Sequence, residues 1–490
     1  MRDQDVAPTE TQKATAVRMR SAVLSLASRI WRATLADVRG ARVWAFGAAT
    51  MLLAGLVTLA YYLNQPFAQM DPDTVDYTRI ANAIPRGHLV DPIRTPGYPL
   101  FIRVVYLVAG QGNLIAVAIA QGVLYVLACL GVYTLALRLT RRAWVAFLVA
   151  ALLDTNVLLL SYVKPIMSEA LALFLVTMLA LIVAQHTRAA TPRTLWLGAV
   201  VLLLLAMTRP EWVYFGVPFF GFLLLVSWRQ GKARPHLRHV ALALVVFYGV
   251  CGLYVVQNSV QYGEQGLSRN QNIDWLGKVM QYHMQNEAPA SYAAITAEVN
   301  RYLASGDTDP VHVIGHDPAL LANNLALAGE YGRAIILHHP IEFTLNTIPV
   351  VFQSLRSITP HQPIIAANAF AAPLHALAAV ASLAQDSTLV FPFLALGWWG
   401  WLLLRRRRTF DERTALLCGL TLIAGYGLAV TSLFVFAQYP RMNTPYDALM
   451  LTVVWTSVAL AIPRLWQLAR GQSHPTPALA AEVGRGEVAR

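Results

Sequence analysis

Long apolar runs separated by short polar connections dominate this chain. A membrane-spanning helix needs about 20 predominantly apolar residues, and about ten runs approach or reach that length. They are residues 43–63, 113–137, 143–162, 167–186, 194–209, 211–228, 240–257, 387–404, 414–436 and 447–463. The pattern predicts an all-α polytopic membrane protein with about 10 transmembrane helices, or 10–12 if part of 340–385 also spans the bilayer.

The arginines give these runs an orientation, because short cytoplasmic loops carry an excess of Lys and Arg. Every second connection is basic: the N-terminal tail, 138–142, 188–193, 229–239, 405–413 and the tail after Arg464. We therefore expect both termini in the cytoplasm. The first loop, the 162–169 link, the Arg209–Pro210 turn and "QYPRMNTPYD" at 438–447 would then lie outside it.

One long polar segment interrupts the alternation. It predicts an extracytoplasmic excursion at 258–386, mainly helical, with one helix near 289–304 and an interfacial amphipathic helix that begins near Pro340. The Ala-rich stretch 363–385 either lies at the interface or pairs with the preceding segment as two more spans. The expected organisation is a cytoplasmic basic tail 1–42, a transmembrane core 43–257 with the first loop at 64–112, the excursion, C-terminal transmembrane helices 387–465, and a disordered cytoplasmic tail 466–490.

Composition supports the membrane assignment and narrows the function. Only 13% of residues are charged, against about 25% in soluble domains, and the mean hydropathy is +0.49. The net charge of +12 is spread between apolar runs, which indicates topology signals and argues against nucleic-acid binding. The three cysteines lie inside apolar runs without CxxC spacing, which argues against a disulfide framework and a zinc site. The first apolar run begins too late for a secretory signal.

The first loop concentrates acidic residues directly after the first predicted span. Asp71, Asp73 and Asp76 fall within six residues of one another. The spacing of apolar residues over 73–84 predicts a short helix lying on the bilayer. We expect Asp73 to fit its N-cap, where a carboxylate accepts backbone N–H bonds, and Asp76 to share its face one turn later. Asp71 would be solvated.

A rigid turn closes this loop. Pro96 and Pro99 restrict the backbone around Gly97, and Arg94 stands beside them. An arginine and a carboxylate held near one membrane face suit a lipid-linked phosphate and an alcohol that must lose its proton.

The order Pro72-Asp73, Tyr77, Ala81 and then Arg94-Thr95-Pro96-Gly97-Tyr98-Pro99 resembles the GT-C-fold membrane glycosyltransferases. These include the dolichyl-phosphate-mannose protein mannosyltransferases and the aminoarabinose transferase of lipid A. "PIMSEALALFLV", "AMTRPEWV" and "YPRMNTPYDALML" resemble further family segments in the same order. The resemblance implies a GT-C-like fold, a polyprenyl-phosphate-linked sugar donor and an essential acid in the first extracytoplasmic loop.

The resemblance and the residue chemistry together suggest roles. Asp73 is the favoured catalytic base, with Asp76 and Glu169 as further candidates. In the family a second acid often follows the first-loop acid directly, whereas here Thr74 follows Asp73. Asp71 also stays open as the working acid. The candidates for binding the donor phosphate are Arg94, Lys164, Arg209 and Arg441, and those for shaping the loop are Tyr77, Pro96, Gly97, Tyr98 and Pro99. Snorkelling explains any one of these cations, whereas four cations that converge on one face would indicate a phosphate clamp.

The expected function is an inverting glycosyltransferase of the inner membrane, with its active site outside the cytoplasm and a glycan, glycolipid or protein as acceptor. No metal site is predicted, no cofactor is required, and a divalent cation stays open. Two alternatives remain. An O-antigen ligase or polymerase would use residues such as His312, His316 or Arg333 of the excursion. A lipid-linked sugar transporter would place polar residues at the bilayer midplane.

Overall fold

The structure is a computed structural model that describes residues 40–316, 325–356, 360–404 and 411–469. The two predicted tails, 1–42 and 466–490, lie almost entirely outside these ranges. Within them every regular element is helical and no strand occurs. Eight helices are long and apolar enough to cross a membrane, or up to ten if each of two bent pairs forms one span. The predicted all-α polytopic fold is confirmed.

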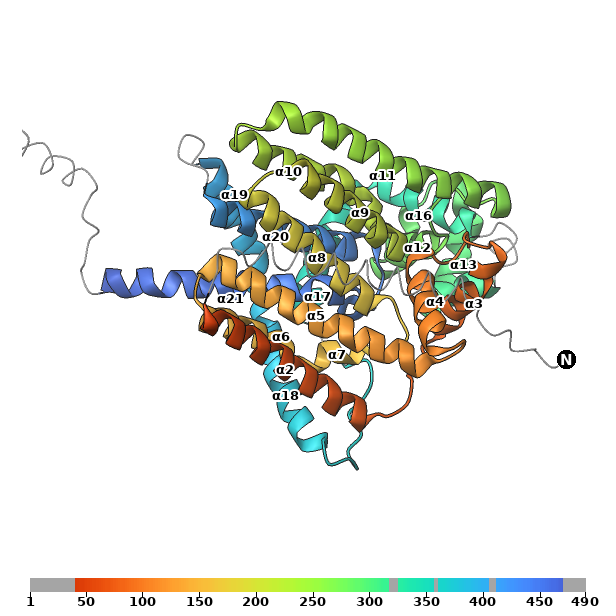
Figure 1. The fold of residues 1–490 in the computed structure, drawn as a ribbon. Helices are drawn as coiled ribbons and strands as arrows, with labels where there is room; N and C mark the ends of the chain where they lie inside the picture. The colour runs from red at the N-terminus through yellow and green to blue at the C-terminus, as the bar shows by residue number, and fades with distance from the viewer. Residues whose placement is uncertain (1–39, 317–324, 357–359, 405–410, 470–490) are drawn as a thin grey trace, which may run out of the picture.

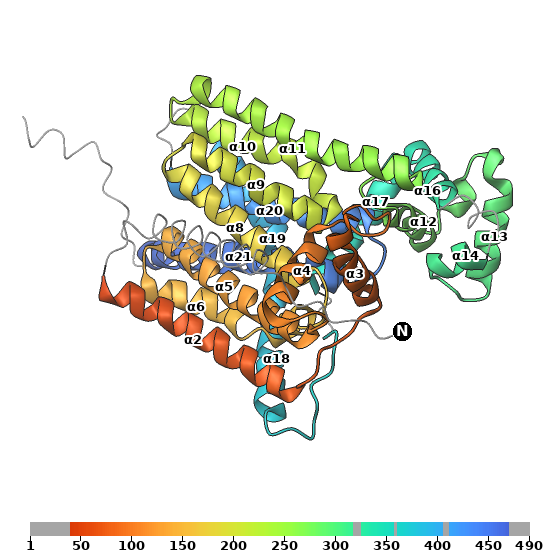
Figure 2. The same cartoon turned by 45° about the vertical axis from the view of Figure 1, so that its right-hand side comes forward.

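The bundle consists of apolar helices, most of which run side by side along one direction, whereas α18 (Ala371–Asp386) runs across them (Figures 1 and 2). They are α2 (Ala41–Asn64), α5 (Leu114–Thr140), α6 (Ala143–Asp154), α7 (Val157–Val163), α8 (Glu169–Arg188), α9 (Pro192–Thr208), η2 (Pro210–Phe215), α10 (Gly216–Arg229), α11 (Ala233–Tyr262), α18 (Ala371–Asp386), η5 (Ser387–Val390), α19 (Phe391–Leu404), α20 (Glu412–Phe434) and α21 (Tyr439–Ala469).

Shorter helices gather at one end of this bundle (Figures 1 and 2). The first loop forms α3 (Pro72–Ala83), η1 (Ile84–Arg86) and α4 (Gly97–Ala109). The excursion forms α12 (Asn270–Gln281), η3 (Gln285–Glu287), η4 (Ala290–Tyr292), α13 (Ala293–Ala304), α14 (Pro310–His316), α16 (Ala326–His338) and α17 (Pro340–Arg356). The helices expected near 289–304 and from Pro340 correspond to α13 and α17.

The bundle differs from the predicted spans in three places. In place of the span expected at 194–209, the 17 residues of α9 form an apolar helix shorter than the candidate spans. Residues 143–162 form α6 and α7, which meet at an angle of 56°. Asn156 restarts the helix there because its side chain accepts the Leu159 N–H at 2.9 Å. In addition, α18, η5 and α19 together form a 34-residue candidate span, Ala371–Leu404, which begins well before the predicted 387.

Glycines allow close contact between helices in the bundle core. A Cβ on Gly131 would lie 2.4 Å from Thr177, and one on Gly419 would lie 2.5 Å from Val183. Without hydrophobic driving force between helices in lipid, such close packing is a main source of association. Both contacts involve α8, which therefore lies at the centre of the bundle and fixes the position of its first residue, Glu169.

The excursion has a core of its own. Leu276 and Val279 of α12 pack with Val299 of α13 and with Tyr331 and Ile335 of α16, all of them buried. Between α16 and α17 the chain turns by 100°, and Figure 2 shows α13 and α14 projecting beyond the bundle. The excursion is thus a folded helical unit at the end of the bundle that carries the first loop.

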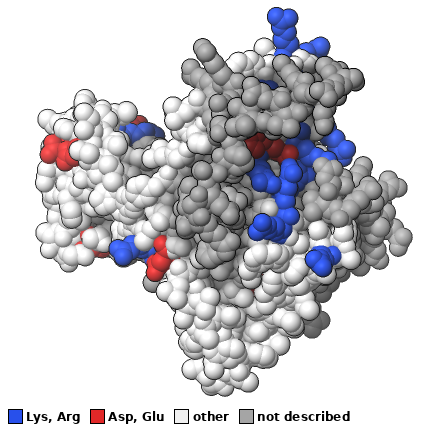
Figure 3. All heavy atoms as spheres, turned by 90° about the vertical axis from the view of Figure 1, so that its left-hand side faces the viewer, with Lys and Arg blue, Asp and Glu red and all other residues white. Residues whose placement is uncertain are grey.

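The two ends of the bundle differ in charge. Lys and Arg gather on the face where α2 begins, which Figure 3 shows directly. The helices α5, α8 and α10 all end in basic residues there, Arg138, Arg188 and Arg229. The opposite end carries α3, α4 and the excursion. The alternation of basic connections in the sequence therefore corresponds to one basic end of the folded chain.

Candidate active site

The first turn of α3 corrects one prediction from the sequence. Asp71, not Asp73, is the N-cap: its Oδ1 accepts the Asp73 N–H at 3.2 Å, and its own N–H donates to Thr74 Oγ1 at 2.9 Å. The prediction was wrong because the helix begins at Pro72, where a missing N–H costs nothing, so that its cap lies two residues earlier than expected. Since Asp71 takes the capping role, the Asp73 side chain is free for other contacts.

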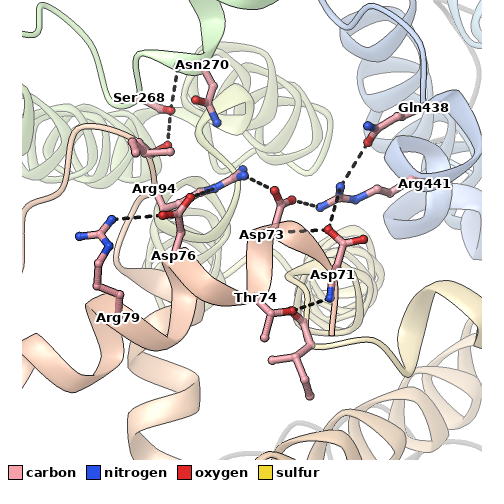
Figure 4. A network of polar contacts seen from close by, with 12 residues as sticks. Asp71, Asp73, Thr74, Asp76, Arg79, Arg94, Ser268, Asn270, Gln438 and Arg441 are labelled. Carbon is pink, nitrogen blue, oxygen red and sulfur yellow. Dashed lines mark hydrogen bonds and ion pairs between the residues drawn. The ribbon is translucent and has the colours of Figure 1, made fainter. Parts of the chain in front are cut away.

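Asp73 lies between two arginines (Figure 4). Arg94 Nη2 donates to its Oδ1, and Arg441 Nη2 donates to its Oδ2. The Asp73 side chain is 17% exposed. The Arg94 guanidinium also lies 5.3 Å from the centre of the Tyr77 ring, a cation–π distance. Each carboxylate oxygen therefore contacts one guanidinium and keeps a lone pair for a further donor.

Arg441 joins the first loop to a second carboxylate. Its Nε donates to Glu169 Oε1 at 2.6 Å, and its Nη1 donates to Gln438 Oε1 at 3.2 Å. Glu169 is the first residue of α8, and its side chain is only 1% exposed. Arg209 approaches the same Oε1 to 3.9 Å and donates from Nε to Glu211 at 2.8 Å. A carboxylate buried this deeply is tolerated because two guanidiniums neutralise it.

Three buried polar atoms of this cluster have no hydrogen-bond partner among the described residues. They are Glu169 Oε2, Arg94 Nε and Arg209 Nη1. Buried polar groups are nearly always paired, so these three atoms are exceptions. Two of the three are guanidinium donors, which prefer carboxylate or phosphate oxygens. The cluster thus has guanidinium N–H donors that its own carboxylates do not use.

Asp91 positions Arg94 by folding the backbone around it. Its Oδ1 accepts the N–H groups of Ile93 at 2.9 Å and of Arg94 at 3.2 Å. Its Oδ2 pairs with Arg79 at 2.9 Å. From the excursion, the Ser268 hydroxyl donates to Ile93 O at 2.6 Å. Arg94 therefore stands on a turn held by its own loop and by the start of the excursion.

The residues expected to shape the loop are tightly packed. Gly97 is the first residue of α4, and a Cβ there would lie 2.5 Å from Met207 O and 2.6 Å from the Thr208 hydroxyl. Tyr98 is fully buried and donates its hydroxyl to Gln121 at 2.7 Å. Tyr77 meets the Tyr98 ring edge-on at 4.7 Å. The turn around Pro96 and Pro99 thus fits against the ends of α5 and α9.

Two other candidates lie differently. Asp76 is at the rim, 3.4 Å from Arg79 and 3.9 Å from Arg94. Lys164 is buried and donates to Gln65 O, with the Phe67 ring centre 5.1 Å away. Burial lowers the pKa of Lys164 to about 8. The structure brings Asp73, Asp76, Glu169, Arg94, Arg209 and Arg441 together, whereas the contacts described for Lys164 lie at the start of the loop.

Sequence reasoning missed several participants. The Asp71-Pro72-x-Thr74 pattern carries a recognisable capping signal, an acid before proline at the first helical position. His361, whose Nε2 lies 3.1 Å from Asp71 Oδ2, follows no motif. Gln438 lies in the segment "QYPRMNTPYD" but only the fold shows that it contacts Arg441. His312 of the ligase alternative pairs with Asp307 at 2.9 Å, and the side chain of His316 lies outside the described residues.

Metal binding was left open, and the described residues contain no group of three His, Cys, Asp or Glu side chains that could hold an ion. Asp71, Asp73 and Glu169 all contact arginines at the first-loop end. A divalent cation, if one is used, would have to share these carboxylates with the guanidiniums. It remains a hypothesis.

A bundle of apolar helices that carries, at one end, an acid held between two arginines has the architecture of a polytopic membrane protein. Consistent with this, residues 93–252 match the sequence model of the dolichyl-phosphate-mannose-protein mannosyltransferase family. The resemblance inferred from the motifs is thereby confirmed over these residues and supports a glycosyltransferase. The match includes Arg94, Glu169 and Arg209, and it lies between Asp73 and Arg441 in the sequence.

Two solved structures of the Archaeoglobus fulgidus oligosaccharyltransferase are similar to this chain. The apo form shares 13% identity at a TM-score of 0.41, over 88% of this chain and 53% of that one. The form tethered with an acceptor peptide containing the NVT sequon shares 13% identity at a TM-score of 0.43, over 87% and 51%. The chain thus spans about half the length of these structures. No curated protein sequence matches it.

Proposed function

We propose that this protein is an inverting glycosyltransferase that moves a sugar from a polyprenyl-phosphate donor to an acceptor on the extracytoplasmic side of the membrane. One observation carries the proposal: Asp73 is held between Arg94 and Arg441, beside guanidinium donors that have no hydrogen-bond partner. Such a site combines a carboxylate for deprotonation with donors for a phosphate. The family match over residues 93–252 supports the same reaction class.

The donor phosphate would bind to Arg94, Arg209 and Arg441, in part by replacing their contacts with carboxylates. The acceptor hydroxyl would donate its hydrogen bond to a remaining lone pair of an Asp73 oxygen. Asp73 takes the proton as the acceptor oxygen attacks the anomeric carbon, and the bond from that carbon to the phosphate oxygen breaks. The electron pair leaves with the polyprenyl phosphate, whose growing charge the arginines stabilise. Attack opposite the leaving group inverts the anomeric configuration.

The basic end of the bundle supports the orientation. Cytoplasmic loops are enriched in Lys and Arg, and these residues gather at the end opposite the site (Figure 3). We place that end in the cytoplasm, with both termini, and the Asp73 cluster outside an inner membrane. The tail of the donor would lie among lipid and helices while its phosphate reaches the interfacial arginines.

Mass spectrometry of glycans and glycolipids from a deletion strain tests the proposal. The strain is complemented with wild type, with Asp73→Asn, or with Asp386→Asn, a matched change at an exposed aspartate at the end of α18. We expect one sugar to be missing in the deletion strain and to return with wild type and Asp386→Asn only. Full restoration by Asp73→Asn at normal membrane levels would exclude Asp73 as the base. Accumulation of unmodified lipid-linked donor without any missing product would indicate a transporter.

A further inference from the structure

The last part of the excursion passes the C-terminal end of α2 and is hydrogen-bonded to it. Asn64 forms a reciprocal pair with Ile365: its Nδ2 donates to Ile365 O at 3.1 Å, and its Oδ1 accepts the Ile365 N–H at 2.9 Å. Gln65 Nε2 donates to Pro363 O at 2.5 Å. These bonds fix residues 361–368, here called the crossing segment, against the beginning of the first loop although some 300 residues separate the partners.

His361 stands at the start of the crossing segment, between α7 and α3. Its backbone N–H donates to Ser161 Oγ at 2.9 Å. The centre of its ring lies 5.4 Å from the centre of the Tyr162 ring, and the two ring planes are inclined by 31°. These contacts aim its Nε2 at Asp71 Oδ2, 3.1 Å away. The His361 side chain is 25% exposed. The backbone bond to Ser161 and the ring contact with Tyr162 therefore place the imidazole against the carboxylate that caps α3.

Asp71 divides its two oxygens between these neighbours. Oδ1 accepts the Asp73 N–H, and Oδ2 faces His361. Arg441 Nη1 lies 4.0 Å from Oδ1. Burial tends to raise the pKa of Asp71, but the hydrogen bond from His361 and the charge of Arg441 outweigh it and leave the pKa below its usual value. Asp71 is thus an anion in the resting site and needs a donor on Oδ2.

We propose that His361 is a positioning residue of the active site: through Asp71 it fixes the first turn of α3, and with it the Asp73 carboxylate between Arg94 and Arg441. The inference rests on the proposed function, because it assigns His361 a part in the reaction of Asp73. It also gives the excursion a direct role in catalysis. The groups that face the imidazole are Asp71 from α3, with Arg441 of α21 behind it, and Tyr162 from α7.

The role of His361 depends on a hydrogen bond that it donates to Asp71. Imidazolium and the neutral tautomer with a proton on Nε2 both donate to Asp71, whereas the other neutral tautomer does not.

Two substitutions separate donation from charge. His361→Leu removes the donor, and we expect kcat to fall about tenfold to a hundredfold, the cost of misplacing a catalytic group, with little change in the donor KM. His361→Gln restores a neutral donor, so most of kcat should return. His312→Leu is the matched control, because His312 forms the other His–Asp contact of the excursion, with Asp307, and it should retain wild-type kinetics.

A double-substitution cycle with Asp71→Asn completes the test. If His361 acts through Asp71, His361→Leu should add little to the loss caused by Asp71→Asn, because coupled residues are not additive. Additive losses, or a wild-type kcat for His361→Leu, would overturn the inference. Equal losses for His361→Leu and His361→Gln together with reduced thermal stability would show a purely structural role. An inactive Asp73→Asn beside a fully active His361→Leu would leave the proposed function intact and remove only this inference.

Discussion

Replacing Asp73 with Asn changes the reaction centre by one atom and one charge. The amide retains one oxygen for Arg94 or Arg441 but presents an NH2 group to the other, which cannot accept a hydrogen bond. One of the two arginine contacts shown in Figure 4 is lost, and the remaining amide cannot take a proton at neutral pH. The capping bonds of α3 use Asp71 and Thr74 and are left unchanged.

The expected effect separates two roles of Asp73. Loss of a general base lowers kcat by about 10²–10⁴-fold, which is about 3–5 kcal/mol in the activation free energy. Loss of the ion pairs acts in the opposite direction on donor binding, because Arg94 and Arg441 no longer have to give up a carboxylate before they contact the phosphate. We therefore expect kcat to fall steeply while the donor KM stays constant or decreases.

The measurement is steady-state sugar transfer by purified protein in lipid nanodiscs, with the donor concentration varied for wild type, Asp73→Asn and Asp386→Asn. Thermal unfolding followed by fluorescence-detected size exclusion shows whether each variant is folded. A kcat for Asp73→Asn within about threefold of wild type, well below the loss expected for a base, would refute the base assignment. A donor KM that rises while kcat stays constant would instead assign Asp73 to binding alone.

Three further predictions concern the frame of the site. Glu169→Gln leaves the charges of Arg441 and Arg209 without their buried partner, which lowers the free energy of unfolding by about 3–5 kcal/mol. Thermal unfolding should therefore occur at a distinctly lower temperature, and an unchanged temperature would contradict the burial argument. Gly97→Ala places a Cβ 2.5 Å from Met207 O and should reduce transfer strongly, whereas Gly55→Ala, with nothing within 4 Å of the new Cβ, should not. Burial lowers the pKa of Lys278 to about 7. Between about pH 7 and 10 the unfolded chain therefore binds more protons than the folded one, so the stability of the wild type relative to Lys278→Met should rise with pH over that range. A constant difference in unfolding temperature would refute this.

The spans and the location of the site could be predicted because both depend on local signals. Apolar runs such as 114–140 and 412–434 are long enough to be recognised by length alone. Asp71, Asp73, Asp76 and the Arg94–Pro99 turn all lie within the first loop, so their proximity could be predicted without tertiary information. The break between α6 and α7 was missed because Asn156, a single capping residue, does not interrupt apolar periodicity over neighbouring leucines.

The arrangement of the site could not be predicted, since its contacts are distant in sequence. Arg441 reaches Asp73 across 368 positions and Glu169 across 272. Nothing in either segment specifies the partner. The choice of Asp71 over Asp73 as the cap depended on where α3 begins, and helix boundaries inferred from pattern shift by one or two residues. His361 lacked any motif, and its contact follows only from the crossing segment.

The wide sequence separation of these partners sets an order of assembly during synthesis. The first loop leaves the ribosome early, whereas Arg441 belongs to α21, the last helix among the described residues. Until α21 is inserted, Asp73 and Glu169 have no Arg441 to neutralise them, and the contact must close a loop of several hundred residues. Chains released before α21 therefore contain Asp73 but lack its ion pair with Arg441. The proposed activity would then require insertion of α21, and the ion pairs of Arg441 would form last.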